Sequence, residues 1–123
     1  MILDEIVRST RARLDSLDPL PVVDPAEMPH RSLGAAIRAC RDRHAIIAEV
    51  KYASPSRGRI HDGSTPEAIA REFAAAGAAG LSVLTEPTYF GGSTGSLVAV
   101  RRAVTIPVLR KDFIIDERQL VET

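Results

Sequence analysis

The hydrophobic pattern from residue 45 onward predicts strands that alternate with helices. Three apolar runs have the length of a strand: AIIAEV at 45–50, LSVLT at 81–85 and IPVLR at 106–110. A continuous apolar run is typical of a strand that is covered on both faces. Three further segments have helical patterns: 66–76, 96–104 and 116–123. Because alternating strands and helices form right-handed crossovers, this order predicts an α/β fold with a parallel sheet.

The first 44 residues predict a helical extension. Apolar residues recur near the helical period over residues 2–17, with two acidic residues in the first turn. A connector with four prolines follows: Pro19, Pro21, Pro25 and Pro29. Ser32 is a suitable N-cap for a second helix over residues 32–40. We therefore expect two parts, a helical extension at 1–44 and three βα units at 45–123.

The ends of the predicted strands carry the residues of greatest chemical interest. Parallel sheets place their functional residues at the carboxyl ends of the strands, in barrels and in open folds. The first strand ends in Glu49 and Lys51, and residues two apart in a strand share a side, so an ion pair is expected. Lys111 stands at the end of the third strand. Four of the five aromatic residues follow these strand ends: Tyr52, Tyr89, Phe90 and Phe113.

Composition singles out the two lysines. Of the 16 basic residues, 14 are arginine, and only Lys51 and Lys111 are lysine. Arginine stays protonated near neutral pH, whereas a lysine can be tuned to donate or accept a proton. Two amines suit an anionic substrate, one of them could act as a proton donor, and the aromatic rings suit a planar group. The alternative is that each lysine is a surface residue paired with a nearby carboxylate.

The remaining composition excludes several classes of protein. The formal net charge of zero gives no general attraction to nucleic acid or membranes, and the apolar runs are shorter than the roughly 18 residues of a membrane span. The N-terminus has acids where a secretory signal has bases, and the single Cys40 suits a reducing cytoplasm. The three histidines lack metal-ligand spacing. We expect a cytoplasmic protein with no metal.

The segments IIAEVKYASPSRG, LSVLTEPTYFGGS and IPVLRKDFIID resemble three successive blocks of the indole-3-glycerol phosphate synthase family, in the same order and at the same spacing. The resemblance covers essentially the whole chain. It implies a TIM (β/α)8 barrel with a helical N-terminal extension. It also implies a lyase of tryptophan biosynthesis, which uses no cofactor. This enzyme closes and decarboxylates 1-(2-carboxyphenylamino)-1-deoxyribulose 5-phosphate to indole-3-glycerol phosphate.

The resemblance also implies roles for six residues by position. Lys111 would be the general acid that assists ring closure and loss of the hydroxyl group. Lys51 would contact the anionic groups of the substrate and take part in proton transfer, held in place by Glu49. Three residues would complete the substrate site, one lining the pocket and two packing on the anthranilate ring: Ser54, Phe90 and Phe113.

The pattern contains three strands, whereas a TIM barrel has eight strands and typically about 250 residues. We therefore expect the N-terminal portion of such a barrel, inactive alone because the family's general base and phosphate-binding loops have no counterpart in these residues. Its open sheet edges would favour self-association or pairing with the remaining part of the barrel.

Two alternatives stay open. One is a non-catalytic assembly module whose open sheet edges recruit another chain. The other is another phosphate-handling barrel, such as phosphoribosylanthranilate isomerase. That isomerase needs a cysteine and an aspartate as acid and base, and Cys40 is badly placed because it precedes the first strand.

Overall fold

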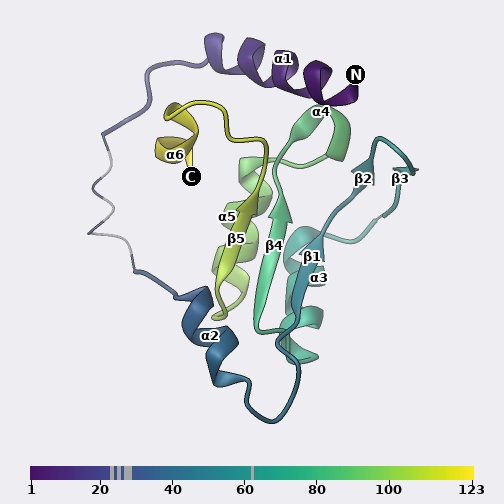
Figure 1. Ribbon diagram of the computed structural model, residues 1–123, viewed down its shortest axis with the longest axis vertical. Helices are drawn as coiled ribbons and strands as arrows, with labels where there is room; N and C mark the ends of the chain where they lie inside the picture. The colour runs from purple at the N-terminus through teal and green to yellow at the C-terminus, as the bar shows by residue number, and fades with distance from the viewer. Residues whose placement is uncertain (23, 25, 27–28, 62) are drawn as a thin grey trace.

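A three-stranded parallel sheet forms the centre of the molecule (Figure 1). The computed structural model describes residues 1–22, 24, 26, 29–61 and 63–123, so Pro25 of the predicted connector lies outside the described residues. The strands of the sheet lie in the order β1 (Ile47–Val50), β4 (Gly80–Leu84) and β5 (Val108–Lys111). Both pairings are parallel. The predicted α/β fold with a parallel sheet is confirmed.

Six helices occur in the described residues: α1 (Ile2–Asp15), α2 (Leu33–Ala39), α3 (Pro66–Ala75), α4 (Pro87–Phe90), α5 (Thr94–Ala103) and α6 (Arg118–Glu122). All but α4 were predicted, with ends that differ by one or two residues. Side-chain caps explain three of the starts, because Ser32, Thr65 and Ser93 each accept a hydrogen bond from a backbone N–H in the first turn. In the part of the chain that is described, no helix combines the length and apolar character needed to cross a membrane.

Four predicted segments differ from the structure. The first strand begins at Ile47 and not at residue 45. The third strand begins at Val108 and not at residue 106, because Pro107 has no N–H for the ladder and contributes only its carbonyl, which accepts from the Leu81 N–H at 2.9 Å. The loop after the second strand contains the short helix α4. The loop after the first strand contains a hairpin of β2 (Ala53–Ser54) and β3 (Gly58–Arg59). Both of these elements are too short to produce a periodic pattern.

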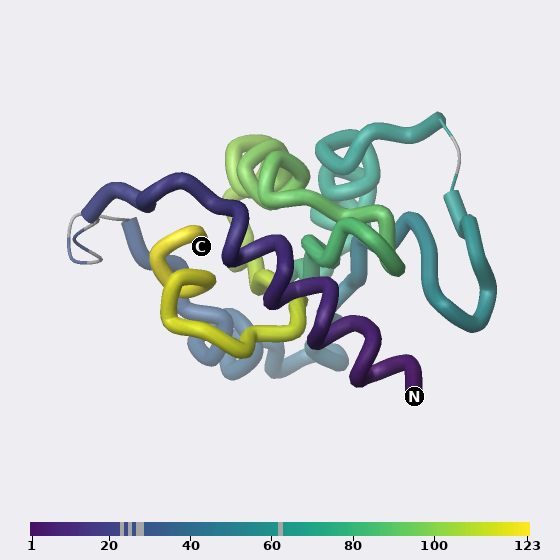
Figure 2. The backbone as a smooth tube through the Cα atoms, turned by 90° about the horizontal axis from the view of Figure 1, so that it is seen from above, coloured from purple at the N-terminus to yellow at the C-terminus, as the bar shows by residue number. Residues whose placement is uncertain are grey.

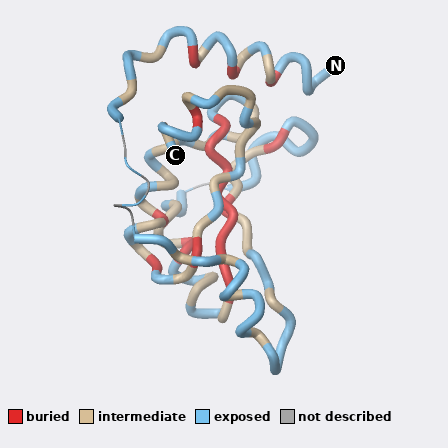
Figure 3. Tube along the Cα trace, turned by 60° about the vertical axis from the view of Figure 1, so that its left-hand side comes forward, coloured by how far each residue is buried: buried red, intermediate tan, exposed pale blue. Residues whose placement is uncertain are grey.

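Helices α3 and α5 cover one face of the sheet and form the core with it. Every residue of β4 is buried, and the buried positions run through the middle of the molecule in Figure 3. Val50, Leu81 and Val83 of the strands pack in one cluster with Ile69 of α3 and Val100 of α5. Full burial of side chains of this size contributes about 1.5–3 kcal/mol each. Packing in this cluster fixes the register of the three strands and thereby aligns their carboxyl ends.

The opposite face of the sheet is open at its two edge strands, whereas Ser82 and Leu84 of the central strand are buried. Ile47 and Leu109 lie on that face and remain 42% and 47% exposed. The expectation that the strands are covered on both faces is therefore wrong for this chain by itself. The reason is that α1 and α2 lie at the two ends of the sheet and not over its open face (Figure 1).

Helix α1 lies across the carboxyl ends of the strands, next to α4 and α6 (Figure 2). Its buried residues, Ile6, Thr10 and Leu14, recur every fourth position and form one stripe. At its end, Arg13 forms an ion pair with Glu122 of α6 at 2.6 Å. The helical extension thus contacts the end of the sheet where functional residues are expected.

Candidate active site

A single carboxylate joins the two lysines of the chain. Glu49 Oε2 accepts a hydrogen bond from Lys111 Nζ at 2.8 Å, and Glu49 Oε1 forms an ion pair with Lys51 Nζ at 3.6 Å. We call these three residues the lysine cluster. The predicted pair of Glu49 and Lys51 is confirmed, and the structure adds Lys111 to it. The Lys111 side chain is 54% exposed, so its amine faces solvent and is accessible to a small molecule.

Strand register explains why residues 62 positions apart meet. Glu49 pairs with Ser82 of β4, and Leu84, two residues further, pairs with Lys111 of β5. Residues at even spacing share a face, so Glu49, Lys51 and Lys111 all point to the open face of the sheet. The Ser82 hydroxyl donates a second hydrogen bond to Glu49 Oε2 at 3.3 Å. The core on the covered face therefore sets the geometry of the cluster on the open face.

The lysine cluster keeps Glu49 ionised. Burial raises the pKa of this carboxyl, but the hydrogen bond from Lys111 and the charges of Lys111 and Lys51 outweigh burial, so that its pKa lies below the ordinary value. Near neutral pH, Glu49 is an anion between two amines and cannot act as a proton donor. Its chemical role is to hold the two amines at fixed positions.

Two of the aromatic residues form a pair at the same end of the sheet. The rings of Phe90 and Phe113 lie 6.0 Å apart between centroids, with a tilt of 37°. The other two predicted aromatics make different contacts. Tyr52 donates to the Ser64 carbonyl at 2.7 Å, and Tyr89 lies 3.5 Å from Glu5 of α1. Only Phe90 and Phe113 are brought together as a hydrophobic wall.

The buried Glu86 holds the turn that carries Phe90. Its carboxylate accepts three hydrogen bonds, from the backbone N–H groups of Thr88, Tyr89 and Phe90. These bonds satisfy the free donors at the start of α4, which explains why four residues form a helix there. The chain then turns at Gly91, which has a φ of 64° that favours glycine. The sequence analysis missed this capping role of Glu86.

Ser54 is buried in the β2–β3 hairpin that follows the first strand. Its hydroxyl accepts from the Arg57 N–H at 3.2 Å and lies 3.4 Å from the Ser56 hydroxyl. These contacts stabilise the hairpin turn. Whether Ser54 also lines a substrate pocket stays a prediction.

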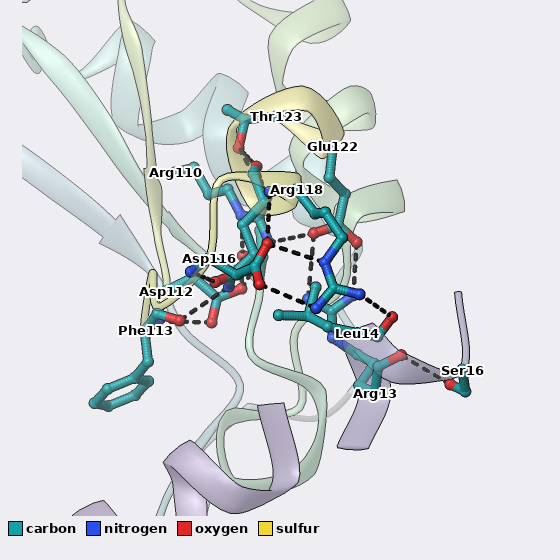
Figure 4. A network of polar contacts seen from close by, with 12 residues as sticks. Arg13, Leu14, Ser16, Arg110, Asp112, Phe113, Asp116, Arg118, Glu122 and Thr123 are labelled. Atoms are coloured by element: carbon teal, nitrogen blue, oxygen red, sulfur yellow. Dashed lines mark hydrogen bonds and ion pairs between the residues drawn. The ribbon is translucent and has the colours of Figure 1, made fainter. Parts of the chain in front are cut away.

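A second charged cluster lies between the end of β5, α6 and the end of α1 (Figure 4). We call it the arginine cluster: Arg13, Arg110, Asp112 and Glu122. The Arg110 and Asp112 side chains are only 4% and 3% exposed. Strand alternation places them on the side opposite to Lys111. The same period of two in LRKDF could have predicted this separation, but the partners on α1 and α6 carry no local signal.

Metal ligation has no candidate group in the described residues, since no three His, Cys, Asp or Glu side chains there lie close enough to hold an ion. The described side chains of the site offer two kinds of interaction. The site combines two amines for anionic groups or proton transfer with a pair of aromatic rings for a planar group.

Comparison with known proteins decides the family. A family model described as indole-3-glycerol phosphate synthase matches residues 3–123. This chain belongs to the indole-3-glycerol phosphate synthase family. An indole-3-glycerol phosphate synthase from Geobacillus thermodenitrificans (strain NG80-2) is 46% identical over 123 residues, which are 99% of this chain and 46% of the relative. A protein of the same name from Sulfurimonas denitrificans (strain ATCC 33889 / DSM 1251) is 41% identical over 133 aligned positions, covering 99% of this chain and 49% of the relative.

The chain spans about half the length of the indole-3-glycerol phosphate synthases that it matches. The family match favours the first interpretation of the sequence over phosphoribosylanthranilate isomerase and over a non-catalytic module. The printed names describe those relatives as whole proteins.

Proposed function

We propose that this chain forms part of an indole-3-glycerol phosphate synthase, a lyase of tryptophan biosynthesis. The reaction is ring closure and decarboxylation of 1-(2-carboxyphenylamino)-1-deoxyribulose 5-phosphate. The observation that carries the proposal is the bridge from Glu49 to both Lys51 and Lys111 at the strand ends. This bridge places two amines where an anionic substrate and a departing hydroxyl group need positive charge and a proton. Family membership and the Phe90–Phe113 pair support the same reaction.

We assign to the site residues the roles that the family resemblance implies. Lys111 is the general acid, since its amine is the more exposed of the two and is held by one short hydrogen bond. Lys51 contacts the anionic groups of the substrate and takes part in proton transfer. Glu49 is the anion that positions both amines. Phe90 and Phe113 pack on the anthranilate ring, and Ser54 lines the pocket from the hairpin.

We also propose that residues 45–123 are the first three βα units of a TIM barrel and that residues 1–44 are its N-terminal extension. The strand order and the open face with Ile47 and Leu109 support this proposal, because further strands would cover that face. The 123 residues are inactive alone and self-associate or pair with the remaining part of the barrel. The ligand is a small phosphorylated molecule in the cytoplasm, with no role for nucleic acid or a membrane.

The proposal is tested by complementation. The 123-residue chain is mixed with the carboxyl-terminal segment of a relative, and indole-3-glycerol phosphate is followed by its fluorescence. We expect turnover from the mixture and none from either part alone. A mixture with Lys111→Arg in this chain is the matched control, because it keeps the charge and removes the tunable amine. Turnover that is equal with and without Lys111 would contradict the assignment of the general acid.

Phosphoribosylanthranilate is supplied to the same mixture as the competing substrate. Isomerisation of this compound without formation of indole-3-glycerol phosphate would replace the proposed reaction with that of the isomerase.

A further inference from the structure

Arg110 uses every N–H donor of its side chain. Its Nε donates to the Thr85 hydroxyl at 2.9 Å. Its Nη1 donates to the Gln119 carbonyl at 2.9 Å and to the Thr123 hydroxyl at 2.8 Å. Its Nη2 donates at 2.9 Å to Asp112 and to Glu122. A guanidinium has five such donors in a fixed plane, and here a single side chain joins the end of β4, the loop after β5 and helix α6.

Two of the residues that Arg110 binds also bind the backbone of Phe113. The Asp112 Oδ1 atom accepts from the Phe113 N–H at 2.7 Å, while its Oδ2 atom binds Arg110. The Gln119 side chain, which is fully buried, donates from Nε2 to the Phe113 carbonyl at 2.9 Å. Phe113 is therefore held at both of its peptide groups, and its ring points away from the charged network in Figure 4.

Thr85 links the same network to Lys111. Its hydroxyl donates to Asp112 Oδ2 at 2.6 Å and accepts from Arg110 Nε, and its backbone N–H donates to the Lys111 carbonyl at 3.0 Å. Lys111 lies between Arg110 and Asp112 in the chain, so both of its neighbours are locked on the buried side. The Lys111 side chain has to leave on the other side, toward Glu49.

We propose that Arg110 is a positioning residue, which acts through Thr85, Asp112 and Gln119 to set the Lys111 amine and the Phe113 ring relative to each other. This inference rests on the proposed function, since it assigns Arg110 to the support of that site. Arg110 itself does not contact substrate. Its contribution is geometric, because proton transfer and ring packing both depend on atomic positions within about 1 Å.

Thr85→Val in the complete, active enzyme tests the proposal. Valine has the shape of threonine but removes the hydroxyl between Arg110 and Asp112. We expect kcat/KM to fall roughly a hundredfold, the typical effect of a misplacement of about 1 Å. Thr85→Ser, which keeps the hydroxyl, should stay within a few-fold of the unmodified enzyme. Thr105→Val, an exposed change at the opposite end of the sheet, is the matched control and should have no effect.

A second measurement separates positioning from simple loss of stability. The enzyme is labelled with 4-fluorophenylalanine, and the 19F signal of Phe113 is assigned from its loss in Phe113→Leu. We expect one narrow Phe113 signal in the unmodified enzyme and in Thr85→Ser, and a broadened or divided signal in Thr85→Val at temperatures where circular dichroism shows it folded. If Thr85→Val does not fold, Gln119→Met, which releases the Phe113 carbonyl, should give the same broadening.

Three results would overturn the proposal. The first is an unchanged kcat/KM in Thr85→Val. The second is a loss of activity in Thr85→Val with an unchanged Phe113 signal, and the third is a loss of activity in Thr85→Ser as large as that in Thr85→Val. Failure of the proposed function is a different result, because the unmodified enzyme would then form no indole-3-glycerol phosphate. The 19F comparison would still report on Phe113 in that case.

Discussion

The lysine cluster and the arginine cluster lie on opposite sides of the same strand end, and they use positive charge in different ways. In the lysine cluster, Lys111 is more than half exposed and makes one short hydrogen bond to Glu49. In the arginine cluster, Arg110 is almost fully buried and all of its donors are bound. A lysine amine that has N–H donors left over can give a proton to another molecule. A guanidinium whose N–H donors are all bound can only hold its neighbours. Residues 110 and 111 are adjacent, yet the Lys111 amine is exposed beside Glu49 and the Arg110 guanidinium is buried with all of its donors bound.

The comparison also shows what charge burial requires. Glu49 and Glu122 are both carboxylates with two cationic neighbours. Burial raises the pKa of Glu122, but hydrogen bonds from Arg13 and Arg110 outweigh it and the net pKa is lowered, as for Glu49. Hydrogen bonds thus outweigh burial in both clusters. In one cluster this occurs at an accessible site, and in the other it occurs where α1, β5 and α6 meet.

Lys111→Arg should produce the largest effect. The change preserves the charge beside Glu49 but replaces a tunable amine with a group that stays protonated. In the complete enzyme we expect turnover to fall roughly 10²–10⁴-fold, the usual contribution of a positioned proton donor. The free energy of unfolding should stay nearly unchanged, because Lys111 is an exposed side chain. A kcat within a few-fold of normal would show that Lys111 is not the proton donor.

The reciprocal change, Arg110→Lys, should lower the stability of the fold in addition to the activity of the enzyme. It keeps the charge but leaves two or more buried acceptors without a donor, at about 1–3 kcal/mol each. We expect the free energy of unfolding to fall by roughly 2–4 kcal/mol, measured by denaturant unfolding. Arg118→Lys is the matched control, because Arg118 makes its ion pairs to Asp116 and Asp15 at the surface. Equal losses in Arg110→Lys and Arg118→Lys would mean that burial of the arginine cluster adds nothing.

Phe113→Ala addresses the ring of a residue whose backbone is bound by Asp112 and Gln119. Its backbone is bound by the network around Arg110, while its ring lies beside Phe90 on the side of the proposed site. Loss of the ring should weaken substrate binding by roughly 1–3 kcal/mol, the value of a buried apolar contact. Enzyme kinetics should show this as a raised KM. Unchanged kinetics together with a lowered melting temperature would assign the ring to the core instead.

A change of pH should give the smallest effect, on the surface ion pair beside the arginine cluster. Hydrogen bonds from Arg118 lower the pKa of Asp116 to about 2. Because the folded pKa lies below the ordinary value, the pair stabilises the fold above about pH 4 and is lost as the pH falls through about 2. An NMR titration of the Asp116 carboxyl should show this midpoint, and Arg118→Gln should return it toward the ordinary value. A midpoint that does not respond to Arg118→Gln would show that another group lowers it.

Local sequence signals predicted the elements of the fold well. Apolar runs gave the three strands, and the cap Ser32 marked the start of α2 to within one residue. Period-two alternation predicted the pair of Glu49 and Lys51. The scarcity of lysine drew attention to Lys51 and Lys111 before any contact was known. These features depend on neighbours within a few residues, so a sequence carries them completely.

Only the tertiary structure decided how distant residues meet. The bridge from Glu49 to Lys111 depends on the register of three strands, which is set by packing of Val50, Leu81 and Val83 against α3 and α5. The partners of Arg110 come from three elements, and one of these partners, Glu122, also pairs with Arg13 of α1, which is 109 residues away from Glu122 in sequence. The separation of Tyr52 and Tyr89 from the Phe90–Phe113 pair is equally a result of where their loops pack. Residue types determined which chemistry was available, and burial of the core determined which of those residues became neighbours.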